Sequence, residues 1–254
     1  MTETLHERSH PTSPAPNLRL SGRRIVITGA ASGIGRSTVK LFAQEGAAVA
    51  LLDRNAAALN ETVESVKGHG IQADITDEAS VTAAINSAAA ALGGIDGVVN
   101  AAGIMFRGTM SEVPADAWRH VLEVNLTGTY IVTRACLPWL LREPSATIVN
   151  IASAQGLLPN APSYTAYAAS KGGVINLSKA LAAELAPRVR VNTICPGMTD
   201  TAMADGYRSN VTDYALARLA DPAEIARAIL FLTGTESSFV TGTALAADGG
   251  RTFH

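Results

Sequence analysis

Tyr167 and Lys171 lie four residues apart in a segment with helical periodicity. Residues at this spacing share one face of a helix, so the phenol and the ammonium would be neighbours. An ammonium beside a phenol stabilises the phenolate, and we expect the pKa of Tyr167 to fall from about 10 toward neutral pH. Such a phenol can protonate a ketone or deprotonate an alcohol. Surface pairs at the same spacing are common, so the pair needs support from its surroundings.

A glycine-rich turn at residues 28–35 (TGAASGIG) follows the β-branched run Arg24–Thr28. Glycine lets the backbone turn sharply and approach a phosphate. The helix expected from Gly33 would direct its free N–H groups and the positive end of its dipole toward that phosphate. The spacing is G-x-x-x-G-x-G rather than G-x-G-x-x-G. A plain strand-to-helix turn would look similar. The interpretation therefore depends on the whole context: a strand before the turn, a helix after it, and an acidic residue at the end of the next strand.

Asp53 follows the next apolar run, residues 47–52. Its distance from the turn is close to the separation of about 20 residues expected for a carboxylate that binds the adenosine ribose. A carboxylate there would repel a 2′-phosphate, which favours NAD over NADP. Arg54 opposes this interpretation, because a neighbouring cation could hold the phosphate. We predict NAD; the alternatives are an NADPH-dependent ketone or 3-oxoacyl reductase and a non-catalytic cofactor-binding sensor.

Strand-like and helical segments alternate along the chain. This rhythm predicts an α/β fold, a single Rossmann-like, doubly wound parallel sheet of about seven strands with helices on both faces. Two helices are expected to be long, at residues 114–141 and 164–186. Pro138 should kink or break the first of them near its end.

Three regions of the chain are expected to differ in order and role. Residues 1–19 are polar and are predicted to be a flexible leader. Residues 20–254 are predicted to form a single NAD-binding catalytic domain. Within that domain, residues 198–219 are expected to form a mobile substrate lid.

The composition excludes several classes of protein. Hydrophobic residues make up 47% of the 254 residues and the formal net charge is −2, which excludes a mainly disordered chain and a strong field for nucleic acid. The two cysteines form no disulfide framework, and no histidines, cysteines and carboxylates have metal-ligand spacing. No apolar run approaches the roughly 18 residues of a membrane span, and we expect no signal peptide because residues 1–17 lack its apolar core. We predict a cytoplasmic protein without metal, membrane or nucleic-acid partners.

Together these features resemble the classical short-chain dehydrogenase/reductase family over about residues 20–250. The matching residues are the turn at 28–35, Asp74, the NAAG run at 100–103, Asn125, Ser153, Tyr167, Lys171, Pro196, Gly197, Asp248 and Gly249. In this order the set is highly specific. The resemblance implies an oxidoreductase that transfers a hydride between a small-molecule secondary alcohol or ketone and NAD(H).

The resemblance also implies a role for each residue. Tyr167 would be the general acid/base, Lys171 would lower its pKa and bind ribose, Ser153 would hold the substrate oxygen together with Tyr167, and Asn125 would hold a water for a proton relay. The implied cofactor contacts are Gly29, Ser32, Gly33, Ile34, Gly35, Asp53, Arg54, Asp74, Ile75, Asn100, Ala101, Ala102, Gly103, Tyr167, Lys171, Pro196, Gly197, Thr199 and Thr201. A homotetramer is also implied, in which the two long helices pack against symmetry mates.

Other residues near the expected site have less direct interpretations. Tyr164 is a rival phenol one turn before Tyr167, and we interpret it as a pocket wall or a structural residue. Cys195 is interpreted as a buried, inert thiol. A fairly apolar substrate pocket is predicted from loop residues that could equally be core: Met105, Phe106, Leu157, Leu158, Met198, Met203 and Tyr207. The substrate itself cannot be derived from the fold.

Overall fold

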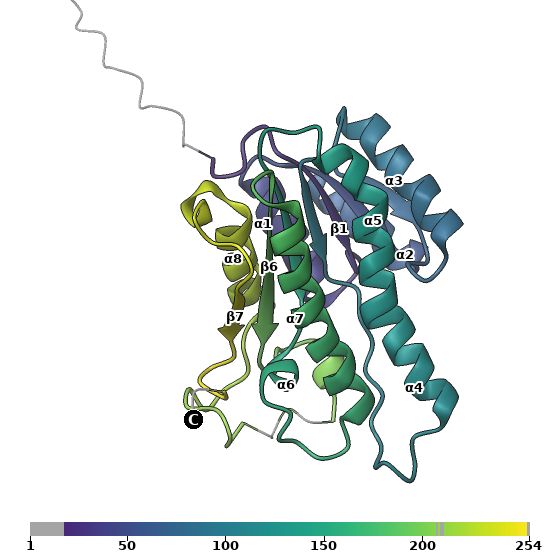
Figure 1. The fold of residues 1–254 in the computed structure, drawn as a ribbon, viewed down its shortest axis with the longest axis vertical. Coiled ribbons are helices and arrows are strands. Elements are labelled where there is room, and N and C mark those ends of the chain that lie inside the picture. Colours follow the sequence, from purple (N-terminus) through teal and green to yellow (C-terminus); the bar gives the residue numbers. More distant parts are fainter. Residues whose placement is uncertain (1–17, 207, 209–210, 253–254) are drawn as a thin grey trace, which may run out of the picture.

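The computed structural model describes residues 18–206, 208 and 211–252. Residues 1–17 of the expected leader, and Tyr207 of the expected pocket, lie outside the described residues. Seven parallel strands form one sheet in the order β3-β2-β1-β4-β5-β6-β7 (Figure 1). The strands are β1 (Arg24–Thr28), β2 (Ala48–Asp53), β3 (His69–Gln72), β4 (Gly97–Asn100), β5 (Ala146–Ile151), β6 (Val189–Pro196) and β7 (Ala244–Ala247).

The strand order reverses between β1 and β4, which lie side by side although two strands separate them in sequence. The predicted doubly wound parallel sheet is therefore confirmed. In such sheets a crevice opens at the carboxyl ends of the strands on either side of the reversal. The glycine turn after β1 and the NAAG run after β4 both lie at this crevice.

Helices cover both faces of the sheet (Figure 1). The main helices are α1 (Gly33–Gln44), α2 (Ala56–Val66), α3 (Glu78–Leu92), α4 (Ala115–Leu122), α5 (Gly128–Leu140), α6 (Ala154–Leu157), α7 (Thr165–Leu185) and α8 (Pro222–Thr233). Helices α3, α5 and α7 share one buried apolar cluster with the sheet, and α1, α2 and α8 share another. Among the described residues, no helix is long and apolar enough to cross a membrane.

Alternation of side chains along β1 produces these two cores. Val26 packs in the cluster with α3, α5 and α7, whereas Ile25 and Ile27 pack in the cluster with α1, α2 and α8. Successive strand residues point to opposite faces, so a run of β-branched residues can supply both cores at once. The sheet is thereby fixed from both sides, and the loops at its carboxyl edge are held on a rigid base.

The prediction of one long α-helix over residues 114–141, kinked or broken only near Pro138, is wrong in one respect. A π-helical segment, η1 (Glu123–Thr127), lies between α4 and α5 and has Asn125 at its centre. Single π turns inside longer helices occur often at functional sites. The widened turn places an amide side chain where a regular helix would not. Pro138 is accommodated within α5, which ends two residues later at Leu140, close to the expected break.

Candidate active site

A cavity of about 1220 Å³ opens at the carboxyl ends of the strands. This volume exceeds that of the usual small-molecule pocket and suits a dinucleotide together with a substrate. Of the predicted cofactor contacts, all but one line this cavity, namely Gly29, Ser32, Gly33, Ile34, Gly35, Asp53, Arg54, Asp74, Ile75, Ala101, Ala102, Gly103, Tyr167, Lys171, Pro196, Gly197, Thr199 and Thr201. Residues from distant parts of the sequence thus converge on one site.

The glycine turn brings two loops of the site into close contact. Gly29 has a φ of +65°, and a Cβ on it would lie 2.7 Å from the backbone nitrogen of Ala102. A Cβ on Gly35 would overlap the carbonyl oxygen of Gly29. Only glycine fits at these two positions, because backbone occupies the space that a side chain would need.

Helix α1 begins in this turn with its N-terminal N–H groups uncapped by any side chain. Ser32 is the N-cap residue but makes no cap hydrogen bond, and the first turn holds no acidic residue. By contrast, Asn55, Asp77 and Asp221 cap α2, α3 and α8 with their side chains. Free N–H groups and the positive dipole end of α1 therefore face the cavity, which fits the pyrophosphate of a dinucleotide.

Two carboxylates lie near this end of the cavity. Asp53 accepts hydrogen bonds from the backbone N–H groups of Ala31 (3.0 Å) and Asn55 (2.9 Å), so its position is fixed by the glycine turn and by α2. Asp74 accepts from the N–H and the hydroxyl of Thr76, and these bonds hold the pKa of Asp74 below its usual value. Both side chains are placed to accept hydrogen bonds from a ligand.

Asn100 does not point into the cavity, so its predicted contact with the cofactor is not made by its side chain. Its amide nitrogen donates to Thr133 (3.1 Å) and to Asn150 (2.8 Å), and Asn150 in turn donates to Ser178 (2.9 Å). These buried polar groups join β4 and β5 to α5 and α7. The segment thereby steadies the sheet, since buried amides of this kind fix the positions of their neighbours.

Tyr167, Ser153 and Lys171 meet at the inner part of the cavity and are all buried. Burial raises the pKa of Tyr167 to about 12, and the neighbouring Ser153 hydroxyl only partly offsets this effect. The expected fall of the Tyr167 pKa toward neutral pH is therefore wrong for this structure. Desolvation of the phenolate outweighs any benefit from the nearby ammonium.

The ammonium of Lys171 makes its hydrogen bond to a backbone carbonyl and not to the Tyr167 hydroxyl. Its Nζ donates to the carbonyl oxygen of Ile151 at 2.8 Å and lies 5.7 Å from the centre of the Tyr167 ring. The ammonium thus lies over the ring rather than on the hydroxyl. Burial lowers the pKa of Lys171 to about 8, so the side chain is mainly charged at neutral pH.

The side chain of Asn125 joins the loop after β4 to α7. Its Oδ1 accepts from the N–H of Ile104 (2.8 Å), while its Nδ2 donates to the carbonyl of Ile104 (2.9 Å) and to the hydroxyl of Ser170 (3.0 Å). Ser170 immediately precedes Lys171, so the amide orders the helix turn that carries the lysine. Asn125 does not line the cavity, and its role in holding a water stays a prediction.

The substrate end of the cavity is less apolar than predicted. Met105, Met198 and Met203 line it, but Phe106, Leu157 and Leu158 do not. The polar residues that also line it and that the sequence analysis did not single out include Arg107, Asn160, Tyr214 and Arg251. Tyr164 lines the cavity too, as expected of a pocket wall. The sequence does contain a signal for Arg107, because it directly follows Met105 and Phe106, which were predicted to line the substrate pocket.

The segment predicted to be a lid is anchored by Tyr214. Its hydroxyl accepts from the backbone N–H of Met198 at 3.0 Å, and its ring packs so closely on Gly197 that a Cβ there would lie 2.7 Å away. Leu216 donates from its backbone to the carbonyl of Gly249 at 3.0 Å. Among the described residues of this segment, only a short 3-10 turn, η2 (Ala202–Ala204), is helical.

Both cysteines are buried free thiols, as interpreted from the sequence. Cys195 lies on β6 beside Ser153 and Lys171, and burial raises the pKa of its thiol to about 12. A thiol with so high a pKa is a poor nucleophile. Cys195 therefore acts as a small core residue behind the site.

Comparisons with known proteins agree with this geometry. A family model described as enoyl-(acyl carrier protein) reductase matches residues 29–252. The chain is 39% identical to 2-(S)-hydroxypropyl-CoM dehydrogenase 3 of Xanthobacter autotrophicus (strain ATCC BAA-1158 / Py2), over 92% of this chain and 98% of that protein. It is 38% identical to the 3-oxoacyl-(acyl-carrier-protein) reductase FabG of Thermotoga maritima, over 92% and 99% respectively.

A solved structure is similar as well. The ligand-free aldohexose dehydrogenase (AldT) of Thermoplasma acidophilum matches with a TM-score of 0.86 and 31% identity, covering 93% of this chain and 96% of that chain. The resemblance stated from the sequence is thus confirmed at the level of the family. The chain belongs to the classical short-chain dehydrogenase/reductase family and is an oxidoreductase that acts on CH–OH groups with a nicotinamide cofactor.

Proposed function

We propose that the protein is an NAD-dependent dehydrogenase of secondary alcohols, with Tyr167 as its general acid/base. The observation that carries the proposal is the pair of Ser153 and Tyr167, both buried and both lining the cavity that also holds the free N-terminus of α1. Two hydroxyls at one point can hold a single substrate oxygen. When bound, the nicotinamide supplies the hydride chemistry.

The protonation states favour proton donation by Tyr167 to a carbonyl oxygen. Since burial raises its pKa to about 12, the phenol is protonated at neutral pH and can donate to a ketone oxygen that Ser153 also binds. In the direction of alcohol oxidation the phenol must first lose its proton. The charged Lys171, 5.7 Å from the ring centre, stabilises the phenolate that forms.

NAD is the proposed cofactor because of Asp53. Its carboxylate is held by Ala31 and Asn55 at the adenosine end of the cavity, where it would accept from ribose hydroxyls and repel a 2′-phosphate. NADPH-dependent reduction of a ketone or 3-oxoacyl group is the second candidate. The neighbouring Arg54, which also lines the cavity, and the similarity to a 3-oxoacyl-(acyl-carrier-protein) reductase favour it.

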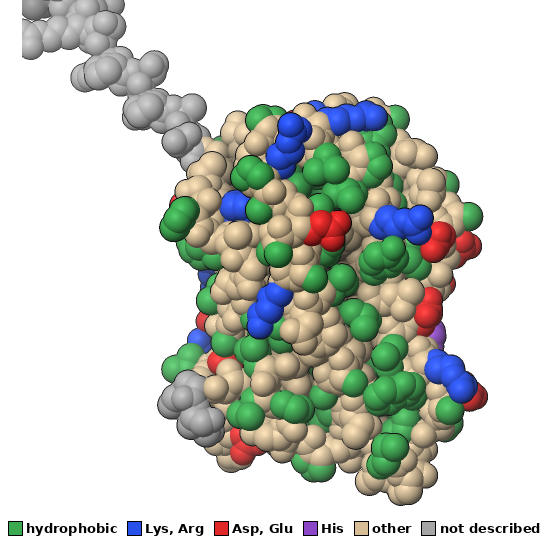
Figure 2. Space-filling view, viewed as in Figure 1, with side chains coloured by type: hydrophobic (Ala, Val, Ile, Leu, Met, Phe, Trp, Pro, Cys, Tyr) green, Lys and Arg blue, Asp and Glu red, His purple; other side chains and the backbone are tan. Residues whose placement is uncertain are grey.

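A homotetramer and a cytoplasmic location are also proposed. Hydrophobic side chains are scattered over the face formed by α4, α5 and α7, between separate charged groups (Figure 2). Tyr130 on α5 is 45% exposed there. Burial of this face against a symmetry mate would remove apolar surface from water. Light scattering that gives the mass of a monomer would contradict the proposed assembly.

The decisive experiment compares the wild type with Tyr167→Phe on a panel of secondary alcohols with NAD⁺ or NADP⁺. The variant should bind cofactor as the wild type does but lose about 1000-fold in turnover, because phenylalanine fills the same space without a proton to exchange. Wild-type-like turnover in the variant would refute the role of Tyr167. If the wild type oxidises no alcohol and reduces no ketone while still binding cofactor, the chain is a sensor. Tighter binding of NADPH than of NADH would favour the second candidate.

A further inference from the structure

The cavity extends beyond Ser153 and Tyr167 to an end that has to hold the substrate, because the glycine turn and Asp53 lie at the other end. The charged side chains that line this part, among the residues that the structure describes, are Arg107, Lys171, Asp205, Asp213 and Arg251. Their signs and positions bear on which substrates the site accepts.

Arg107 is held close to the acid/base residue by an aromatic ring. Its guanidinium carbon lies 4.5 Å from the centre of the Tyr164 ring, and that ring is centred 6.3 Å from the ring of Tyr167. The guanidinium face is attracted to the electron-rich face of the ring. Stacking of this kind orients the N–H donors in the guanidinium plane, in the fork that matches a carboxylate or sulfonate.

Arg251 forms part of the wall of the same end. It is only 6% exposed, donates to Asn160 (2.7 Å) and Asp213 (3.1 Å), and lies 5.4 Å from the centre of the Tyr214 ring. These contacts join the loop after β5, the lid segment and the C-terminal turn. Arg251 therefore sets the shape of the wall, and its charge lies within it.

The acidic residues of this end lie farther out. The side chains of Asp205 and Asp213 are 67% and 72% exposed. Asp248, nearer the wall, does not line the cavity, and its carboxylate accepts from the N–H groups of Gly250 and Thr252. Hydrated charges at a rim act more weakly than charges within a low-dielectric wall. Of the charged residues that line this end, the cationic ones are therefore buried or half-buried, whereas the two acidic ones are exposed.

We propose that the substrate is a secondary alcohol or ketone that also carries an anionic group, a carboxylate or a sulfonate, and that Arg107 binds this group. Ser153 and Tyr167 hold the reacting oxygen at the same time. This inference rests on the proposed function, since it assumes that the reaction takes place at Tyr167. One aromatic ring separates Arg107 from Tyr167, so the anionic group lies several bonds from the reacting carbon.

The test compares three alcohols that differ only in charge: cyclohexanol, 4-hydroxycyclohexanecarboxylate and 4-hydroxycyclohexanesulfonate. In the wild type, kcat/KM should be higher for one or both anions than for cyclohexanol. In Arg107→Met, kcat/KM for the preferred anion should fall about 10- to 100-fold, the usual effect of losing a charged hydrogen bond, while cyclohexanol changes less than about threefold. Arg119→Met is the matched control, because Arg119 is an exposed arginine on α4. This substitution should change kcat/KM neither for the preferred anion nor for cyclohexanol.

A binding measurement separates this inference from the proposed function. Cyclohexanecarboxylate, which cannot be oxidised here, is titrated into the cofactor-bound protein by calorimetry; the wild type should bind it and Arg107→Met should bind it at least tenfold more weakly. That result without any alcohol oxidation would support the anion site and contradict the dehydrogenase. Oxidation of cyclohexanol with an equal kcat/KM for all three alcohols, unchanged in ratio by Arg107→Met, would overturn the anion site and leave the dehydrogenase intact.

Discussion

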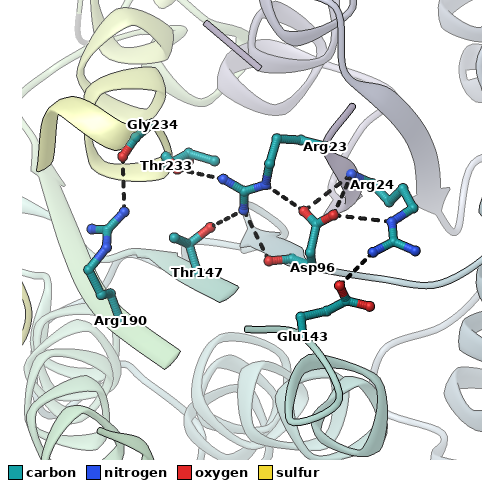
Figure 3. A network of polar contacts seen from close by, with 8 residues as sticks. All are labelled: Arg23, Arg24, Asp96, Glu143, Thr147, Arg190, Thr233 and Gly234. Carbon is teal, nitrogen blue, oxygen red and sulfur yellow. Dashed lines mark hydrogen bonds and ion pairs between the residues drawn. The ribbon is translucent and has the colours of Figure 1, made fainter. Parts of the chain in front are cut away.

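At the amino ends of β1 and β4, Asp96 accepts from the backbone N–H of Arg24 and pairs with the guanidinium groups of Arg23 and Arg24 (Figure 3). Arg23 also donates to the carbonyl of Thr233 at the end of α8 and to the hydroxyl of Thr147 at the start of β5. At the carboxyl ends of the same two strands, the chain instead places a cavity lined by the uncapped N-terminus of α1 and by NAAG-run residues.

The amino ends of the strands therefore contribute mainly to stability, and the carboxyl ends of the same strands contribute mainly to ligand binding. Polar groups that already have protein partners fix the neighbouring elements and have little left for a ligand. Donors and carboxylates that face a cavity can bind one. Changes to the paired groups at the amino ends should therefore alter the free energy of unfolding and leave cofactor binding intact, whereas changes at the glycine turn and its neighbours should weaken cofactor binding.

The largest expected effect is at the amino ends. Asp96→Ala should lower the free energy of unfolding by about 3 kcal/mol, because it leaves two partly buried guanidinium groups without their carboxylate. Urea denaturation measures this. Asp116→Ala is the control, since Asp116 is an exposed partner of Arg119 at 3.9 Å and should cost less than about 0.5 kcal/mol. An equal loss in both variants would mean that the network in Figure 3 contributes no more than a surface pair.

The second expected effect is at the glycine turn. Gly35→Ala should weaken cofactor binding by at least about 100-fold, because its Cβ would push the turn away from the phosphate position. Gly172→Ala on α7 is the control, since its nearest neighbour would lie 3.8 Å away. Fluorescence titration with NADH measures both. Unchanged binding in Gly35→Ala would show that the turn can relax without losing the pyrophosphate site.

The sequence predicted most of the fold because the relevant signals are local. The β-branched run at residues 24–28 is observed with the same bounds, and Asp221, a residue type that is common at N-caps, caps α8 in a capping box with Glu224. Glycine positions and strand ends then bring nearly all the residues that were predicted to bind the cofactor to the lining of one cavity.

Three features could not be predicted because they depend on tertiary packing. The π-helical turn at Asn125 forms to satisfy both backbone groups of Ile104, which is 21 residues away in sequence. The pKa of Tyr167 depends on burial, which spacing along a helix does not report. Arg251 reaches the substrate end from the C-terminal turn, and no local signal in the sequence places it beside the loop after β4.

The third prediction concerns Lys171, whose pKa in the folded protein is lowered by burial from 10.5 to about 8. Between these two values the unfolded chain binds more protons than the folded one, so stability rises with pH. From pH 7 to 9.5 the wild type should gain about 2 kcal/mol relative to Lys171→Met. Tyr167, whose pKa is raised from 10.0 to about 12, has the opposite effect but only at higher pH. Parallel curves for the two proteins in urea would mean that Lys171 is not desolvated.

The smallest expected effect is a change in the preference for NADH over NADPH at Asp53, within the cavity itself. Asp53→Asn removes the charge that would repel a 2′-phosphate but keeps an oxygen for the N–H of Ala31 or Asn55, so the turn should hold. The ratio of the dissociation constants of NADPH and NADH should fall by about tenfold. Asp74→Asn should weaken both cofactors alike, because the resemblance places Asp74 beside the adenine, which the two share. If Asp53→Asn leaves the ratio unchanged, cofactor choice lies with Arg54 rather than with the carboxylate, and the NADPH-dependent reductase becomes the better description of the enzyme.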